Sequence, residues 1–133
     1  MSYSSIGTQI KTVLLTISDF NLVYGYEPKE LLKYPCATVT ASSHADIFAT
    51  TASNQRTFKF DIRLYFRTDT AEDAEGILRD LADQVIVAFE ANPTLNGSCD
   101  FARPISGNWL FQEREVPVRV VEIVIECLKR LNR

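Results

Sequence analysis

The stretch that decides the fold is RTFKFDIRLYFRT, residues 56–68. Large apolar residues occupy every second position, which is typical of a β-strand with one face turned toward a core. The predicted core-facing residues are Phe58, Phe60, Ile62, Leu64 and Phe66. The residues predicted on the opposite, half-solvated face are Lys59, Asp61, Arg63, Tyr65 and Arg67. The function of that second face is the main question that the sequence raises.

The predicted strand is long for a chain of 133 residues. At about 3.3 Å per residue it spans roughly 40 Å, whereas a globule of this size has a diameter of roughly 35 Å. Before it, residues 42–55 are small and polar with no sustained period, and Ile47 and Phe48 are their only large apolar side chains. We therefore expect a long β-hairpin arm whose polar part is a loop that becomes ordered against another subunit.

Two helices are predicted, one before and one after these strands. Residues 4–18 place apolar side chains at helical spacing behind serines that suit an N-cap. A longer apolar stripe runs from Ala74 to Phe89 and ends before Asn92-Pro93. Both patterns predict amphipathic helices that cover a sheet.

Further strands are predicted at residues 22–24 and at residues 34–41, a β-branched run that opens at a proline. The sequences Asn96-Gly97 and Ser106-Gly107-Asn108 predict turns, the second with one strand on each side. Residues 118–130 close the chain as a strand with an apolar face and a face that carries glutamates. The order predicts a single α+β domain, residues 1–133, in which two helices pack on one face of a mostly antiparallel sheet.

Composition excludes several classes of protein. The chain is 46% apolar and 23% charged, which is typical of a globular domain, and its net charge of −3 provides no basic field to attract nucleic acid. Cys36, Cys99 and Cys127 are expected to be buried, reduced thiols, which suits folding in a reducing compartment. With neither a signal-peptide pattern nor a membrane-helix pattern, we expect a soluble protein.

The sequence offers little support for catalysis or for a cofactor or metal site. It contains no recognised catalytic, zinc or phosphate-binding motif. His44 is expected to be a solvated loop histidine, and Asp80 and Asp83 to be part of a solvated helix face. We expect a protein that is not an enzyme, although a small enzyme that uses Asp80 or Asp83 stays open as an alternative.

The order of the segments resembles the tail terminator (tail completion) proteins of long-tailed bacteriophages, including the minor tail protein U type. The similarity covers residues 5–130, nearly the whole chain. The segments that carry it are YPCATVTASS (34–43), RTFKFDIRLYFRT (56–68), AEDAEGILRDLADQVIVAFEANPTLNG (71–97) and VRVVEIVIECLKR (118–130).

The resemblance implies a structural virion protein without catalytic residues, metal or cofactor. Such proteins form a hexameric ring that caps the head-proximal end of the tail tube, stops further tube polymerisation and provides the joint to the head connector or head-completion protein. DNA passes through the lumen without sequence-specific binding. The implied location is the neck region of the virion, after assembly in the cytoplasm of the host bacterium.

A ring needs contact surfaces and a lumen, and the second face of the long strand is a candidate for both. The candidate interface or lumen residues are Ile47, Phe48, Lys59, Asp61, Arg63, Arg67, Glu122 and Glu126. Their mixed charges favour contacts between subunits over attraction of DNA. If Arg63 and Arg67 meet Glu122 or Glu126 of a neighbour, reversing both arginine charges should weaken the ring and leave the fold nearly unchanged.

Two alternatives to a tail terminator stay open. The first is another phage neck or tube component, such as a head-closure or tail tube protein. The second is a nucleic-acid-binding module, because the second strand face combines Lys59, Arg63 and Arg67 with Tyr65.

Overall fold

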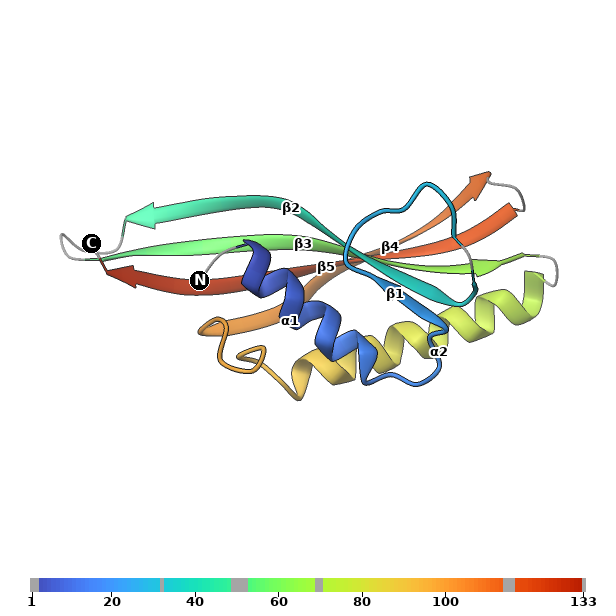
Figure 1. Cartoon of the computed structure of the whole chain (residues 1–133), viewed down its shortest axis with the longest axis horizontal. Coiled ribbons are helices and arrows are strands. Elements are labelled where there is room, and N and C mark those ends of the chain that lie inside the picture. Colours follow the sequence, from blue (N-terminus) through green and yellow to red (C-terminus); the bar gives the residue numbers. More distant parts are fainter. Residues whose placement is uncertain (1–2, 32, 49–52, 69–70, 114–116, 133) are drawn as a thin grey trace.

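Two helices and five strands form the fold in the computed structural model, which describes residues 3–31, 33–48, 53–68, 71–113 and 117–132 (Figure 1). In chain order they are α1 (Tyr3–Leu15), β1 (Leu22–Tyr24), β2 (Cys36–Phe48), β3 (Ser53–Arg67), α2 (Ala71–Glu90), β4 (Phe101–Glu113) and β5 (Pro117–Asn132). The predicted α+β class is confirmed.

The five strands form one twisted sheet in the order β1-β2-β3-β5-β4. β1 is parallel to β2, and every other neighbouring pair is antiparallel. The central strand β3 pairs with β5 along its whole length, from Ser53 opposite Asn132 to Arg67 opposite Val118. The β2–β3 hairpin and the end of β5 project beyond the helices at one end of the molecule (Figure 1), as predicted for a long hairpin arm.

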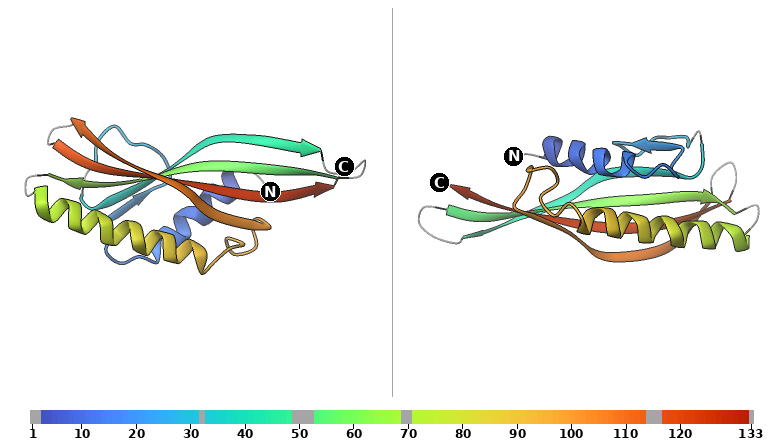
Figure 2. Two further views of the ribbon diagram at one scale, coloured as in Figure 1. Left: turned by 180° about the vertical axis from the view of Figure 1, so that it is seen from behind. Right: turned by 90° about the horizontal axis from the view of Figure 1, so that it is seen from below.

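Both helices pack against the same face of the sheet (Figure 2). The helix residues that share one core with the sheet recur at spacings of three and four, and they are Ile6, Ile10, Val13, Leu14, Leu78, Leu81, Val85 and Phe89. From β3, the residues Phe58, Phe60, Ile62 and Leu64 join this core and are at most 3% exposed. The face assignment made from the period of two is therefore confirmed, with Phe66 half-buried at the margin of the core.

A second, smaller core lies on the opposite face of the sheet. Cys36, Tyr65, Val118 and Val120 are fully buried there, against Leu22, Tyr24, Leu31 and Tyr34. The prediction that Tyr65 lies on a half-solvated face is wrong, because β1 and the chain that follows it cover this part of the sheet. The exposed fraction of Tyr65 is 0%.

Much of the polar segment predicted as a loop is strand. Residues 43–48 pair with β3, from Ser43 opposite Lys59 to Phe48 opposite Asn54, after a register shift between Ala41 and Ser43. Small polar residues have weak strand propensity, but a ladder with β3 satisfies their backbone hydrogen-bonding groups. Residues 49–52 of the predicted loop lie outside the described residues.

The turn predicted at Ser106-Gly107-Asn108 is also wrong. These residues lie inside β4 and pair with Val124, Ile123 and Glu122. The local irregularity is a register shift between Pro104 and Ser106, where a bulge accommodates a proline that cannot donate to the ladder. The other predicted turn, at Asn96-Gly97, is present, with positive φ at both residues.

All three cysteines are free and buried, as predicted. In the part of the chain that the structure describes, neither helix has the length and apolar character needed to cross a membrane.

Candidate assembly surfaces

The face of β3 opposite the helices carries a charged cluster, and the partners of its arginine belong to the same chain. The Arg63 Nε–H donates a hydrogen bond of 3.0 Å to Oε2 of Glu122, its directly paired residue on β5. Nη1 of Arg63 lies 3.9 Å from Oε2 of Glu27. Burial and the nearby charge of Glu122 raise the pKa of Asp61, while Arg63 lowers it. The sequence analysis expected Arg63 to meet a carboxylate of a neighbouring subunit, whereas here its partner belongs to the same chain.

This intrachain pair changes the expected effect of charge reversal. The side chains of Arg63 and Glu122 are only 29% and 20% exposed. An exposed ion pair contributes little to stability, whereas a partly buried one is costly to break because a desolvated charge is left without its partner. We therefore correct the expectation that reversing Arg63 leaves the fold nearly unchanged.

Tyr65 and Glu27 are the members of this cluster that sequence reasoning missed. The Tyr65 hydroxyl donates a hydrogen bond to Oε1 of Glu27, which comes from the chain segment that follows β1. Burial, with that hydrogen bond, raises the pKa of Tyr65 to about 12. Glu27 is far from Tyr65 in sequence and belongs to no periodic segment, so no local pattern signals this contact.

We expect Tyr65→Phe to lower the free energy of unfolding by about 1–2 kcal/mol, because Glu27 loses its buried donor. A phenol in an unfolded chain has a pKa of about 10. The raised pKa of Tyr65 therefore stabilises the fold below about pH 10, and this stabilisation is lost as pH rises toward 12. Denaturant unfolding from pH 7 to 11.5 should show a steeper alkaline loss for the native chain than for Tyr65→Phe. Tyr26→Phe, at a residue that is 62% exposed, is the matched control; equal pH profiles for all three proteins would contradict this role.

The other predicted interface residues lie at separate places on the sheet. Glu126 lies 3.7 Å from Arg103 of β4, measured from Oε1 to Nη2. Lys59 lies directly opposite Glu126 in the β3–β5 ladder, and Arg67 is exposed at the end of β3. The backbones of Ile47 and Phe48 pair within β2 and β3, but their side chains lie outside the described residues.

His44 lies in β2 and not in a loop. The Tyr3 hydroxyl is 2.7 Å from its Nδ1 atom, and its ring packs against Phe58 at a centroid distance of 6.0 Å. Among the residues that the structure describes, no three histidine, cysteine, aspartate or glutamate side chains are grouped to hold a metal ion. The geometry around His44 indicates a role in fixing α1 to the sheet.

The edge strand β4 exposes a set of large apolar side chains. Phe101, Ile105, Trp109, Leu110 and Phe111 are each between 37% and 73% exposed. β4 pairs with β5 on one side only, so its other backbone edge has no partner strand in the described sheet. Strand edges of this kind pair readily with another chain. Sequence alternation could not identify this surface, because it does not reveal which strand is last in a sheet.

Arg119 holds the outer half of β4 in place. Its guanidinium carbon lies 4.2 Å from the Phe111 ring centroid and 5.2 Å from that of Trp109. Its Nε–H donates to Glu75 of α2 at 3.2 Å, and its Nη1 donates to the Leu110 carbonyl at 3.2 Å. These contacts connect β4 and β5 to α2 and hold the apolar edge in a fixed position relative to the helix.

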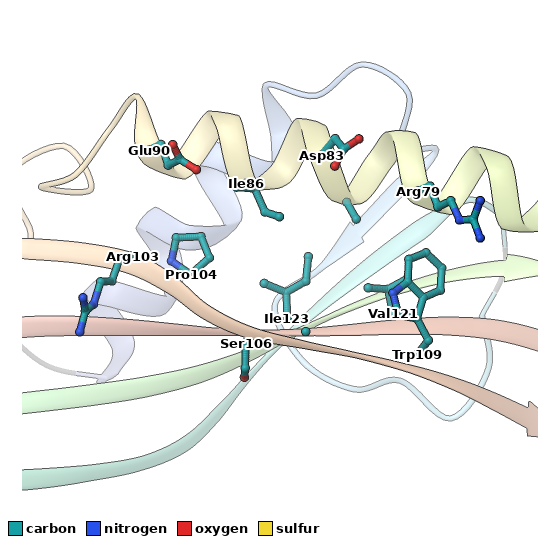
Figure 3. Close-up of a pocket in the computed structure, with 12 residues that line it drawn as sticks. Arg79, Asp83, Ile86, Glu90, Arg103, Pro104, Ser106, Trp109, Val121 and Ile123 are labelled. Atoms are coloured by element: carbon teal, nitrogen blue, oxygen red, sulfur yellow. The ribbon is translucent and has the colours of Figure 1, made fainter.

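A groove of about 690 Å³ lies between α2 and β4 (Figure 3); we call it the α2–β4 groove. Its apolar lining consists of Ala82, Ile86, Pro104, Trp109, Val121 and Ile123. Arg79, Asp83 and Glu90 line it from α2, and Arg103 lines it from β4. Asp80 lies elsewhere on α2 and is exposed, so the two aspartates singled out in the sequence do not both line this groove.

Together, the unpaired edge of β4 and the adjoining α2–β4 groove form one candidate binding surface. Neither was predicted from the sequence. Their apolar lining suits the binding of a partner. No protein-family model matches this chain, and no curated protein is significantly similar to it in sequence.

Proposed function

We propose that this protein is a structural subunit that assembles with copies of itself into a ring. In this proposal the ring, a hexamer, caps the head-proximal end of a phage tail tube. It stops tube polymerisation and provides the joint to the head connector or head-completion protein. The phage assignment rests on the resemblance in segment order to tail terminators, and the assembly role also has structural support.

The observation that carries the assembly role is the outer half of β4. Its inner half has the usual protection of an edge strand, a proline and a bulge at Pro104 and Ser106. Its outer half pairs regularly with β5 up to Glu113 and exposes Trp109, Leu110 and Phe111. A long, regular and apolar edge is a poor surface for a solvated monomer and a good one for contact between subunits.

The alternative functions would use the exposed edge of β4 in different ways. A tail tube or head-closure protein would use it too, but a tube subunit would polymerise without limit, whereas a terminator forms a closed ring. A nucleic-acid-binding module has weaker support, because Arg63 and Arg119 bind carboxylates of their own chain. The ring lumen still allows DNA to pass without sequence-specific contacts.

We expect the purified chain to show a mass above one subunit in light scattering after size exclusion, with the fraction rising with concentration. Closed rings should be visible in negative stain, and added protein should limit the length of growing tail tubes. Trp109→Ser with Phe111→Ser should reduce association by about tenfold or more, since two apolar contacts are lost. Tyr26→Ser, at another exposed aromatic residue, is the control. A strict monomer that also leaves tube length unchanged would refute the proposal.

A further inference from the structure

Acidic and basic residues of this chain are unevenly distributed between α2 and the sheet. α2 carries six acidic residues and one arginine. Three strands, β2, β3 and β5, continue past Phe101, where β4 begins opposite Leu128. We call residues 43–48, 53–57 and 128–132 the sheet extension; its charged residues are Asp46, Arg56, Lys129 and Arg130. The acidic helix and the basic extension are complementary surfaces of one molecule.

Asp83 and Glu90 supply negative charge at the α2–β4 groove. They lie seven residues apart, on one side of α2, and both line the groove. Glu75, by contrast, binds Arg79 and Arg119. Neither the Asp83 nor the Glu90 side chain has an ion pair or hydrogen bond to the rest of the described chain. Arg79 and Arg103 also line the groove, but each is paired with a glutamate of its own chain, Glu75 and Glu126 respectively. The groove therefore combines an apolar lining with two carboxylates available to a basic ligand.

Arg130 supplies available positive charge at the sheet extension. Its backbone N–H donates to Asp100, but its side chain is exposed and contacts no acidic group within the described residues. Arg56 binds Asp46 and Lys129 binds Asp100, in exposed pairs of 2.6 Å and 3.5 Å. The single Lys129–Asp100 contact is of the weak surface type, whereas Arg56 holds Asp46 with two hydrogen bonds.

The extension cannot reach the groove of its own chain. The groove lies along Arg103 to Trp109 of β4, and the extension continues the sheet in the opposite direction from Phe101 (Figure 1). The complementary surfaces can meet only between two copies, in a head-to-tail contact. Contacts of this type form a ring when the rotation between copies closes.

We infer that the α2–β4 groove of one subunit binds the basic sheet extension of a second copy of this chain. This inference rests on the proposed function, because it names the contact that joins neighbouring subunits of the ring. Asp83 and Glu90 attract the extension through its Arg130 and Lys129. The apolar lining of the groove then excludes water from the contact, which strengthens these attractions.

The test uses two full-length variants with opposite defects. The groove variant is Asp83→Lys with Glu90→Lys, and the extension variant is Arg130→Glu with Lys129→Gln. Each alone should associate at least about tenfold more weakly than the native chain, because like charges then face each other across the contact. An equimolar mixture should regain association, since each variant offers the surface that the other now complements. The mixed ring should alternate and contain an even number of subunits.

Matched controls separate assembly from folding. Asp80→Lys with Glu30→Lys changes the charge by the same amount as the groove variant at exposed sites outside the groove. Lys33→Glu reverses the charge of one exposed basic residue outside the extension, as Arg130→Glu does within it. Thermal melting should be similar for all variants, and native association should weaken at high salt.

The outcomes distinguish the two proposals. Two outcomes overturn the inference but not the proposed ring. In the first, the variants associate as well as the native chain; in the second, the mixture of variants does not regain association. If only the groove variant is defective, the occupant is not the sheet extension, and the inference is again overturned. If the native chain never associates, even at tube ends, both proposals fail.

Discussion

Phe60→Ala should lower the free energy of unfolding by about 3–5 kcal/mol, the largest effect that we expect from one substitution. The Phe60 ring is 2% exposed at the centre of β3. Gly7 of α1 lies so close that an added Cβ atom there would be 3.3 Å from the ring, and the Tyr3 ring centroid is 5.8 Å away. Removing the ring therefore leaves a cavity that the sheet cannot easily close. Denaturant unfolding at neutral pH, followed by circular dichroism, measures the loss.

Phe111→Ala is the matched control for Phe60→Ala. The substitution is chemically the same, but Phe111 is 73% exposed on the edge strand. Its loss removes the stacking of Arg119, which contributes about 0.5–1 kcal/mol at an exposed site. Equal destabilisation by both substitutions would show that the assignment of core and edge is wrong.

Arg63→Glu should lower the free energy of unfolding by about 2–3 kcal/mol. The substituted carboxylate would face Glu122 and Glu27, with Asp61 nearby on the same strand. Thermal melting of the subunit at low concentration, where association is minimal, measures this effect apart from assembly. Adding Glu122→Arg to the variant should recover part of the loss, because the ion pair is restored in reversed order.

Arg67→Glu is the control for Arg63→Glu. Arg67 is exposed at the last position of β3, where substitutions usually change stability by no more than about 0.5 kcal/mol. If Arg63→Glu proves as mild as Arg67→Glu, the Arg63–Glu122 contact does not contribute to folding.

The period of two in residues 56–68 predicted the central strand and its core face correctly, because one-sided burial leaves a clear alternation. Burial on both faces is harder to recognise. The adjacent residues Val120 and Val121 were a signal of it, since neighbours in a strand point to opposite faces and both are apolar. The face of Tyr65 was predicted correctly, but its burial was not, because its cover comes from a segment with no periodic pattern.

Loop and turn predictions from local residue type were wrong where pairing with a neighbouring strand determined the structure. Residues 43–48 and Ser106-Gly107-Asn108 read as loop and turn, yet both are paired in the sheet. A long, fully paired partner can override weak strand propensity, because backbone hydrogen bonds do not depend on the side chain. The α2–β4 groove could not be predicted at all, since it depends on strand order, which a single sequence does not state.

The long β3–β5 ladder has a consequence for how the chain folds. In the sequence, only residues 49–52 separate β2 from β3 and only residues 114–116 separate β4 from β5, whereas the chain between β3 and β5 includes all of α2 and β4. Closing that long loop costs roughly 2 kcal/mol more conformational entropy than closing a hairpin tip. No tight turn therefore fixes how the two halves align, and a slip by one residue would turn every apolar side chain of β3 toward the wrong face. The Arg63–Glu122 pair, joining positions 59 residues apart, penalises such a slip and so helps to secure the fidelity of folding.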